Sequence, residues 1–594
     1  MNTMKRQKRM TLKDEFPRLV GCLILVLTSI VSSGESIFEP VAKDTKQPND
    51  TTETTKNSNK TDSVDEEKSL ILFKDGAYLA KFIMPDLASE SEKAVYAKLR
   101  GAVKDKIKAD VAYNTDIIPA GQTRDPNENA VIIGNTNFDE SKTATENAEY
   151  GDYSLKVINN KVVLSFDSKE DGIELVNLFI KAIKTDDNGC YWVDRSLSVS
   201  KQALPQLSGL PKYPSSETTL VDCRDSTSMI VAKRTTLADF TSYCSALENE
   251  GFTLYSSRDN VSGNYFRIYT KDGIAINAYF APSTKSARII SGPITDIPTK
   301  EVDTTPETVS PSLTLLAQGN RDNGLGMIYL LPNGKFLIID GGYVRGKQIY
   351  DILKELAPNK DKIVITAWYT SHTHGDHQQS LMSFLKERYK DVTIESILYN
   401  YTTSEQYDSI TTGSDGAGSA KNFSNTLTSY VSKDTKVIKP HTGQIYNYGS
   451  TQVEVLYTVE DVLPEKLDYL NTSSLVIRVT IGDHSLLALA DTTHVSGDIM
   501  RNMFGSYLES DMVQLAHHGT YPGYASLYNT IKAPVLIWPS NLTNAKTQMK
   551  DGAVTAAVNN ATDVYVVNSG NVTLNLPYTP INNKQDFLTS VGGN

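Results

Sequence analysis

Apolar and polar positions in the first half of the chain repeat with the periods of short strands and single helices. Residues 130–136 and 153–166 alternate as strands do, and residues 170–184 carry apolar side chains at helical spacing. Strands and helices therefore succeed each other along this stretch. The pattern predicts a small α/β domain over residues 69–204.

A second pattern begins at residue 205. Residues 237–250 have the periodicity of a helix, and residues 264–282 are typical of a β-hairpin. Residues 294–312 are rich in proline and threonine, a composition that favours a linker. We therefore expect a small α+β domain over residues 205–300, and we find no catalytic motif in it.

The last half of the chain, residues 305–594, contains the most continuous apolar segments. Residues 327–343 predict two strands joined by a turn. Residues 363–369 form an uninterrupted apolar run of the kind found in strands that are buried on both faces. A helical pattern follows that run at once. These features predict an α/β domain with a buried sheet.

The first 68 residues differ from everything that follows. Residues 1–34 combine a basic start with an apolar stretch, Leu19–Val31, that is shorter than the roughly 20 residues needed to span a bilayer. This pattern predicts a signal peptide, with a retained membrane anchor as the alternative. The protein is accordingly expected to be secreted or held at the cell surface. Residues 35–68 are polar and bury too little apolar area to fold, which predicts a disordered linker.

Composition and net charge reduce the classes of function that the chain can have. The chain has 594 residues and a formal net charge of −11. A nucleic-acid scaffold needs a basic face, so nucleic acid is expected only as a substrate. The sequence has no CxxC pair, which disfavours a thiolate zinc site. A disulfide between Cys223 and Cys244 and a set of free buried thiols are equally open alternatives.

Four side chains of metal-binding type follow the apolar strand within six residues: His372, His374, Asp376 and His377. The two histidines of the first pair lie two residues apart, so in extended backbone they share one face. Gly375 lets the chain bend, which turns Asp376 and His377 toward a second point. Imidazoles and carboxylates that converge in this way are typical ligands of divalent cations. The spacing therefore indicates two neighbouring metal sites.

The segment His-Thr-His-Gly-Asp-His resembles the HxHxDH signature of the metallo-β-lactamase superfamily. Three segments match that family in its order: a strand ending in Asp340-Gly341-Gly342, a strand ending at Asp491, and a strand ending at the pair His517-His518. The resemblance covers residues 305–594 and is strongest for the branch of DNA-uptake competence proteins and phosphorylcholine esterases. It implies an αββα sandwich with two divalent metal ions, zinc first, with manganese or iron as alternatives.

The resemblance also implies roles for individual residues. The implied metal ligands are His372, His374, Asp376, His377, the bridging Asp491, and His517 or His518. Asp376 would orient the attacking group or accept its proton. The member of the histidine pair that is not a ligand would support the site or protonate the leaving group, with His517 slightly favoured as the ligand because it comes first after the strand.

Asp340 and Asn400 modify the expected set of metal ligands. Asp340 is expected to orient a metal-bound histidine, because carboxylates commonly hold such imidazoles. The family often has a further histidine where this chain has Asn400, so the first metal site is expected to have fewer protein ligands. His441 is an alternative ligand or substrate contact, His494 lies either at the edge of the site or outside it, and His484 is expected at the surface.

These features together predict an exported metal-dependent hydrolase that uses a metal-bound hydroxide. The expected substrate is a phosphodiester, either a choline-phosphate or teichoic-acid ester of the cell envelope or a nucleic acid. A carbonyl ester or lactam hydrolase of the same fold is one alternative. A surface-binding protein with a vestigial metal domain is the other, and the complete set of candidate ligands argues against it.

Overall fold

The structure is a computed structural model. It describes residues 64–146, 148, 151–167, 169–201, 205–215, 217–319, 321, 323–401, 416–465, 467–567 and 570–592. The predicted signal segment 1–34 and most of the predicted linker 35–68 lie outside the described residues. None of the helices within the described ranges combines the length and the hydropathy needed to cross a membrane.

Two sheets and three helices follow one another between residues 69 and 201. The larger sheet has six strands in the order β10-β6-β7-β5-β3-β4, and its central pairs are parallel. Apolar residues of α1 and α3 pack with this sheet in one core. The elements are β1 (Ser69–Lys74), β2 (Ala77–Tyr78), β3 (Ala80–Met84), α1 (Glu90–Ile107), β4 (Asn114–Thr115), β5 (Asn129–Ile133), α2 (Asp139–Thr145), β6 (Tyr153–Ile158), β7 (Lys161–Ser165), α3 (Lys169–Ala182), β8 (Lys184–Thr185), β9 (Tyr191–Asp194) and β10 (Ser198–Lys201).

The next sheet is antiparallel and has six strands in the order β11-β12-β16-β15-β14-β13. The predicted helix and hairpin are present as α4 and as β14 with β15. Side chains of α4 cover one face of the sheet, where Phe240 and Leu247 meet Ile276 and Ile289. The elements are β11 (Thr218–Arg224), β12 (Thr227–Lys233), α4 (Leu237–Asn249), β13 (Thr253–Val261), β14 (Asn264–Lys271), β15 (Ile274–Ala281) and β16 (Ser286–Pro293).

The αββα sandwich expected from the sequence is confirmed for the last part of the chain. Its first sheet has eight strands in the order β23-β22-β20-β19-β18-β17-β31, with β21 paired to β20. The elements of this half are β17 (Ser312–Leu315), β18 (Gly326–Leu330), β19 (Phe336–Asp340), α5 (Gly346–Leu356), β20 (Val364–Tyr369), α6 (Gly375–Arg388), β21 (Thr393–Ile394), β22 (Ser396–Leu398), α8 (Gly416–Tyr430), β23 (Lys436–Ile438) and β31 (Val572–Asn575).

The second sheet of the sandwich has seven strands in the order β24-β25-β26-β27-β28-β29-β30. Strands β27 to β30 are parallel to one another, so their carboxyl ends meet at one edge. The elements of this half are β24 (Ile445–Tyr448), β25 (Thr451–Tyr457), β26 (Val476–Ile481), β27 (His484–Ala488), α9 (His494–Phe504), β28 (Met512–Gln514), α10 (Ala525–Ile531), β29 (Val535–Trp538), α11 (Leu542–Gln548), α12 (Gly552–Asn560), β30 (Asp563–Val566) and α13 (Lys584–Ser590).

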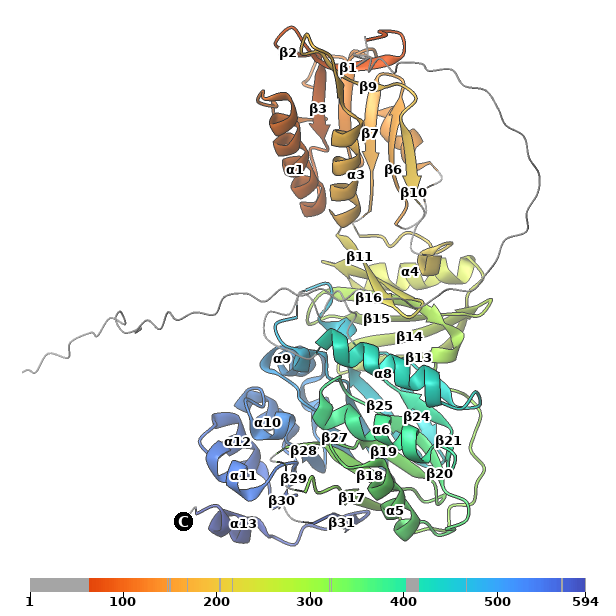
Figure 1. Cartoon of the computed structure of the whole chain (residues 1–594), viewed down its shortest axis with the longest axis vertical. Coiled ribbons are helices and arrows are strands. Elements are labelled where there is room, and N and C mark those ends of the chain that lie inside the picture. The colour runs from red at the N-terminus through yellow and green to blue at the C-terminus, as the bar shows by residue number, and fades with distance from the viewer. Residues whose placement is uncertain are drawn as a thin grey trace, which may run out of the picture. The chain divides into compact units, whose positions relative to one another are not determined.

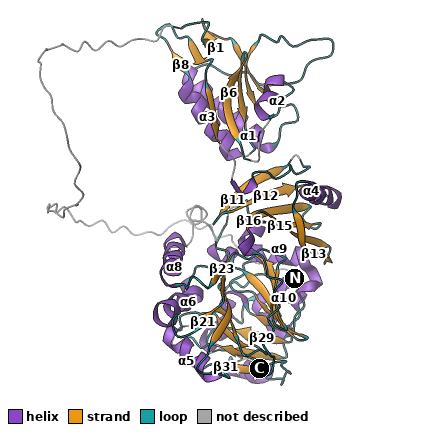
Figure 2. Cartoon of the chain, turned by 90° about the vertical axis from the view of Figure 1, so that its right-hand side faces the viewer, coloured by secondary structure: helices purple, strands orange, loops and turns teal. Residues whose placement is uncertain are grey.

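The alternation of side chains along the strands separates the layers. Leu337 and Ile339 of β19 point into the core between the two sheets, whereas Ile338 points outward to the helices. Helices α5, α6 and α8 cover the outer face of the first sheet (Figure 2). Helices α10 to α12 lie beside strands β28 to β30 of the second sheet (Figure 1). This layering leaves the strand ends as the place where loops from both sheets meet.

The β11–β16 sheet shares a core with the second half of the sandwich. Its face opposite α4 contributes Val231, Tyr279 and Ile290 to the cluster that contains Tyr457 and Met503. Polar contacts reinforce this packing: Asn264 Nδ2 donates to the Met503 carbonyl at 2.7 Å. Separating the two parts would expose these side chains to water, so we expect the two parts to unfold as one cooperative unit.

The three cysteines in the described part of the chain are free thiols, and the disulfide alternative is wrong. Cys223 belongs to the core on the sandwich side of the β11–β16 sheet, whereas Cys244 of α4 belongs to the core on its other face. The sheet lies between the two sulfur atoms, so they cannot reach bonding distance without unfolding. Burial raises the pKa of both thiols.

We predict that Cys190, Cys223 and Cys244 react slowly with Ellman's reagent in the native protein. All three are buried, and reaction requires an accessible thiolate. In denaturant without any reductant, all three should become reactive. If two of them stayed unreactive until reductant was added, a disulfide would be present and the free-thiol assignment would be wrong.

Candidate metal centre

The change from strand to helix after β20 places the side chains of the predicted metal motif. Strand β20 ends at Tyr369, and helix α6 begins at Gly375. His372 and His374 therefore lie on the extended segment between the two elements, while Asp376 and His377 lie in the first turn of the helix. The two pairs therefore reach one small region from the loop and from the helix, and the ring centroids of His372 and His377 lie 4.2 Å apart.

The remaining candidate ligands come from the second sheet. Asp491 follows β27, and the pair His517-His518 follows the neighbouring parallel strand β28, so all three residues lie at the same sheet edge. His517 and His518 both have left-handed backbone conformations, with φ values of 48° and 56°. The His517 backbone N–H donates to the Ala490 carbonyl at 3.0 Å, which ties this turn to the residue before Asp491.

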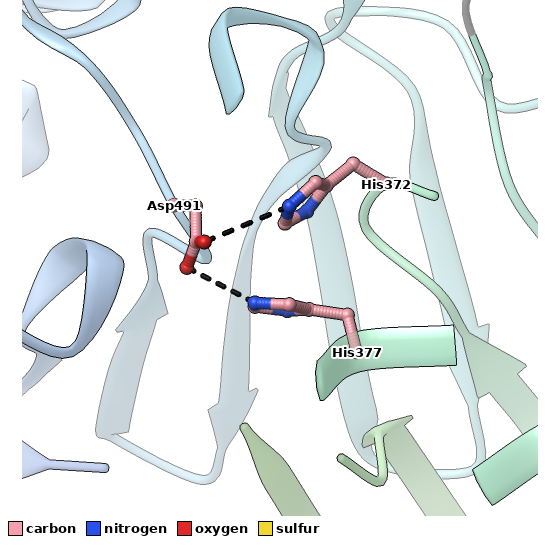
Figure 3. Close-up of side chains that lie close together, drawn as sticks. All are labelled: His372, His377 and Asp491. Carbon is pink, nitrogen blue, oxygen red and sulfur yellow. Dashed lines mark ion pairs between the residues drawn. The ribbon is translucent and has the colours of Figure 1, made fainter. Parts of the chain in front are cut away.

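The two carboxylate oxygens of Asp491 face different histidines. Oδ1 lies 3.1 Å from His377 Nε2 and 3.6 Å from His518 Nε2. Oδ2 lies 3.6 Å from His372 Nε2 and 3.9 Å from His517 Nε2. Figure 3 shows His377 on its helix and His372 on its loop, each directed at a different oxygen. One buried carboxylate thus lies between two groups of imidazoles.

Each group contains one further candidate ligand. Asp376 Oδ2 lies 3.2 Å from His518 Nε2. The described chain has two potential metal-binding groups: Asp376, His377 and His518 form one, and His372, His377 and Asp491 form the other. His374 Nδ1 lies 3.0 Å from His372 Nε2. We call the first group the Oδ1 side and the second the Oδ2 side, after the Asp491 oxygen that each contains.

The Oδ1 side fits a cation. His377 Nε2, His518 Nε2 and Asp491 Oδ1 are buried, and within the described part of the chain none of these atoms has a hydrogen-bond partner. Buried polar atoms are normally satisfied, so three converging exceptions need an explanation. Two ligand atoms about 2.1 Å from a tetrahedral zinc lie about 3.4 Å apart, which matches the 3.1 Å and 3.6 Å separations around Asp491 Oδ1.

Burial and charge put four of the candidate ligands, His372, His374, Asp376 and Asp491, into the protonation states that bind cations. Burial lowers the pKa of His372 and His374, which keeps both imidazoles neutral at neutral pH. Burial alone would raise the pKa of Asp491, but the attraction of the surrounding histidines, His377 first, outweighs it and holds that pKa well below its usual range. The pKa of Asp376 is lowered in the same way, because the His518 imidazole 3.2 Å away and His377 outweigh the effect of burial. His377 differs: burial alone would lower its pKa, but the carboxylates of Asp491 and Asp340 raise that pKa well above its usual range.

Asp340 orients His377, the interaction that the sequence predicts for it. Its Oδ2 accepts from His377 Nδ1 at 2.8 Å, which directs Nε2 toward Asp491. The Ser371 backbone N–H and hydroxyl also donate to Asp340, each at 2.8 Å. His518 is fixed in the same manner, because its Nδ1 lies 3.0 Å from the Pro539 carbonyl and its Nε2 then faces the centre.

Two buried or half-buried amides contact the carboxylates of the centre, and sequence reasoning missed both. Asn323 Nδ2 donates to Asp376 Oδ2 at 2.7 Å, and Asn471 Nδ2 donates to Asp491 Oδ2 at 3.4 Å. Asn323 lies in a glycine-rich loop and Asn471 in a short turn before β26. Neither position carries a sequence signal, because many other asparagines occur in similar loops.

The remaining histidines lie apart from these groups. His441 is buried and its Nδ1 bonds to Glu460 Oε2 at 2.8 Å, so it belongs to neither potential metal-binding group. His494 is about half exposed, with its ring 5.6 Å from that of Tyr524. His484 is partly buried at the start of β27. Of the pair after β28, His518 joins the group with Asp376 and His377, while His517 Nε2 lies 3.9 Å from Asp491 Oδ2. The choice of His517 as the ligand stays a prediction.

No family model matches the chain, and no curated protein matches its sequence. Solved structures with similar folds include the metallo-beta-lactamase fold protein YhfI from Bacillus subtilis, at 15% identity and a TM-score of 0.27, covering 45% of this chain and 100% of YhfI. Zn(2+)-bound PqqB from Methylobacterium extorquens has 12% identity and a TM-score of 0.30, with 45% and 100% covered. Yeast PDE1 has 11% identity and a TM-score of 0.30, with the same coverage.

We predict that Asp491→Asn weakens cation binding on both sides of the centre together. Each carboxylate oxygen faces a different histidine group, and an amide offers only one acceptor oxygen and no charge. Metal content of the purified protein, measured by plasma mass spectrometry, should fall from two equivalents to fewer than one. Asp483→Asn, in an exposed turn, is the matched control and should keep both. Retention of two tightly bound ions in Asp491→Asn would show that this carboxylate does not bridge them.

We further predict that Asp340→Asn lowers metal affinity by about 10- to 100-fold without unfolding the protein. Asparagine tolerates the left-handed backbone of residue 340, whose φ is 53°, but it cannot accept all three hydrogen bonds that Asp340 accepts. His377 then loses its fixed orientation. Competition with a chromophoric chelator measures the affinity, and an unchanged value would remove Asp340 from the centre.

Proposed function

We propose that this protein is a metal-dependent hydrolase of the metallo-β-lactamase superfamily that binds two divalent cations. The observation that carries the proposal is the convergence of His377 Nε2, His518 Nε2 and Asp491 Oδ1, three buried polar atoms without hydrogen-bond partners in the described chain. These atoms lie 3.1 to 3.6 Å from one another or from Asp376 without hydrogen-bond geometry, and a buried polar atom left unsatisfied costs about 1–3 kcal/mol. A vestigial domain has no reason to retain that arrangement.

The donor set favours zinc, with manganese or iron as alternatives. The candidate ligands are imidazoles and carboxylates, and no thiolate is among them. Asp376, His377, His518 and Asp491 Oδ1 would hold one cation. His372, His374 and Asp491 Oδ2 would take part in holding the other.

A phosphodiester is the proposed substrate class. When bound, a pair of divalent cations supplies Lewis acidity and lowers the pKa of water. A chain with a net charge of −11 and ionised Asp376 and Asp491 at its centre would otherwise repel an anion. A phosphodiester has two non-bridging oxygens that suit two neighbouring cations. An acyl ester or lactam gains less from that arrangement, although the same residues would serve its hydrolysis.

The chain's own residues bind and orient the reacting groups. A hydrogen bond from Asn323 fixes Asp376, and a hydrogen bond to Asp340 fixes His377. These two side chains therefore cannot rotate away from the centre. Asp376 is proposed to orient the attacking group or to accept its proton. Two exposed rings, Tyr469 two residues before Asn471 and Tyr524 with its centroid 5.6 Å from that of His494, offer apolar faces to a leaving group.

The proposed location is the cell envelope or the medium. The basic and apolar pattern of residues 1–34 supports export, and the resemblance to the competence-protein and phosphorylcholine-esterase branch supports a choline-phosphate ester, a teichoic-acid ester or extracellular nucleic acid as the substrate. A surface-binding role for the N-terminal units is compatible with this activity in the same chain.

We predict that the metal-loaded protein hydrolyses bis(p-nitrophenyl) phosphate or p-nitrophenyl phosphorylcholine faster than nitrocefin or a p-nitrophenyl acyl ester. Chelation should abolish the activity, and zinc or manganese should restore it. The double variant His372→Ala, His374→Ala should lose activity by at least a hundredfold, because no side chain replaces the lost cation. His484→Ala, away from the centre, should keep wild-type rates.

Two outcomes would contradict parts of this proposal. Nitrocefin turnover well above phosphodiester turnover would favour the carbonyl-hydrolase alternative. Protein purified without chelator that contains no zinc, manganese or iron, and takes up none on addition, would contradict the metal-dependent activity itself and favour the binding protein.

A further inference from the structure

A cavity of about 460 Å³ lies where the β11–β16 sheet meets the sandwich. Its walls come from three parts of the chain: strands β13 to β15, residues 298–303 and residues 442–449. None of the candidate metal ligands is among its described lining residues. Small-molecule sites occupy cavities of roughly 300–1,000 Å³ and are frequent where two packed units meet. The size and the position of this cavity therefore suit a small organic ligand.

One face of the β11–β16 sheet forms the floor of the cavity. Arg258 of β13 pairs with Phe266 of β14, and Ile268 of β14 pairs with Asn277 of β15. Paired residues of neighbouring strands share a face, and Phe266 and Ile268 lie two positions apart, so all four side chains lie on the same side. That side faces the sandwich, because Phe266 belongs to the core shared with it. The floor thus has an apolar part and two polar side chains.

Hydrogen bonds between the sheet and the sandwich keep the cavity formed. Arg258 Nη1 donates to the Gly443 carbonyl at 2.9 Å, and Gln444 Nε2 donates to Asn277 Oδ1 at 2.7 Å. Gly443 and Gln444 are both buried lining residues. A ligand would therefore enter walls that are already in place, which lowers the cost of ordering on binding.

Residues 298–303 form the wall that opens to solvent. The Tyr255 hydroxyl donates to the Pro298 carbonyl at 2.8 Å, and Lys300 Nζ lies 4.2 Å from the centroid of the Tyr255 ring. These two contacts attach the segment to β13. Beyond them Lys300 and Glu301 are exposed, and Val302 is 79% exposed. The cavity is therefore reached past this segment.

Asn277 has unused hydrogen-bonding capacity at the floor of the cavity. Its side chain is 4% exposed, and its Oδ1 accepts from Gln444. Its Nδ2 has no hydrogen-bond partner among the residues that the structure describes. Buried amide N–H groups are normally satisfied, so this donor needs an acceptor. An oxygen atom of a ligand seated on the floor would provide one.

The charges around the cavity cancel. Two groups of ion pairs border it, one with a positive charge in excess and one with a negative charge in excess: Arg258–Glu454–Arg478 and Asp303–Lys335–Glu395. Arg267 is paired with Asp259, and the neighbours Lys300 and Glu301 add one charge of each sign. No net field attracts an ion of either sign, and the donor at the floor is an uncharged amide. A neutral ligand fits these walls best.

We propose that this cavity binds a neutral saccharide. The apolar C–H face of a sugar ring would lie against Phe266 and Ile268, and a hydroxyl or acetamido oxygen would accept from Asn277 Nδ2. An ion would lose hydration here without gaining a net opposite charge. The site goes beyond the proposed hydrolytic function and does not depend on it. It would give the chain a second point of contact with a glycan-containing polymer.

The first test is calorimetry on the full chain with N-acetylglucosamine, N,N′-diacetylchitobiose and cellobiose as neutral probes. Glucosamine and glucuronate are the charged counterparts. At least one neutral probe should bind with a millimolar or lower dissociation constant, and both charged sugars should bind at least tenfold more weakly. A chelator should not change these affinities. Hydrogen exchange should slow on binding in peptides that cover residues 298–303 and 442–449.

Variants of Asn277 test the floor of the cavity. Asn277→Asp still accepts from Gln444 but has no N–H to donate, and Asn277→Leu removes the donor without adding a charge. Both should weaken binding of the neutral sugar at least tenfold while thermal unfolding shows a folded protein. Asn260→Asp is the matched control: it makes the same chemical change at an exposed position of β13 whose left-handed backbone aspartate tolerates, and it should bind as the wild type does.

Several results would overturn the inference and leave the metal-dependent hydrolase intact. These are no binding of any neutral probe, tighter binding of glucosamine or glucuronate, and protection from exchange that falls outside the lining segments. Wild-type affinity in a folded Asn277 variant would also overturn it. If both Asn277 variants failed to fold, the location of exchange protection in the wild type would decide. Loss of the metal centre, in turn, would leave the saccharide site unaffected.

Discussion

The buried carboxylate of Asp491 is the interaction on which the centre depends. It is 1% exposed and lies among four imidazoles, two at each oxygen. A lone carboxylate in such a place would carry a large desolvation cost, which the neighbouring histidines or a cation must offset. The parallel strands β27 and β28 deliver Asp491 and the histidine pair to the same edge, and β20 delivers the remaining ligands opposite them. The sandwich can therefore be understood as a frame that brings three strand ends around one carboxylate.

Much of this arrangement can be predicted from the sequence, because the candidate ligands are close to one another in the chain or lie at strand ends. The apolar run 363–369 predicts a buried strand, and the histidines and Asp376 after it predict the ligands. The His-His pair shows the limit of such reasoning. Which of two adjacent side chains faces which oxygen depends on the left-handed backbone of residues 517 and 518, and position after a strand does not reveal it.

Dependence on tertiary structure also explains the other differences between the sequence-based predictions and the structure. Asn323 meets Asp376 from 53 positions away, through a loop whose path is set by tertiary packing. The sequence leaves a disulfide between Cys223 and Cys244 open, because it does not show on which face of a sheet each sulfur lies. Their strand and helix instead place the sulfurs on opposite faces of one sheet, a relation that depends on side-chain alternation within an assembled layer.

The β11–β16 sheet contacts the segment between β25 and β26, and that segment leads to the candidate metal centre. Arg288 of β16 donates to the Glu460 carbonyl at 3.0 Å and to the Asp461 carbonyl at 2.6 Å, and Tyr279 of β15 donates to the Asp461 carboxylate. The same segment continues to Asn471, which contacts Asp491. Because these contacts are buried or partly buried, the sheet restricts where the segment can lie. The β11–β16 sheet thereby constrains one side of the candidate metal centre.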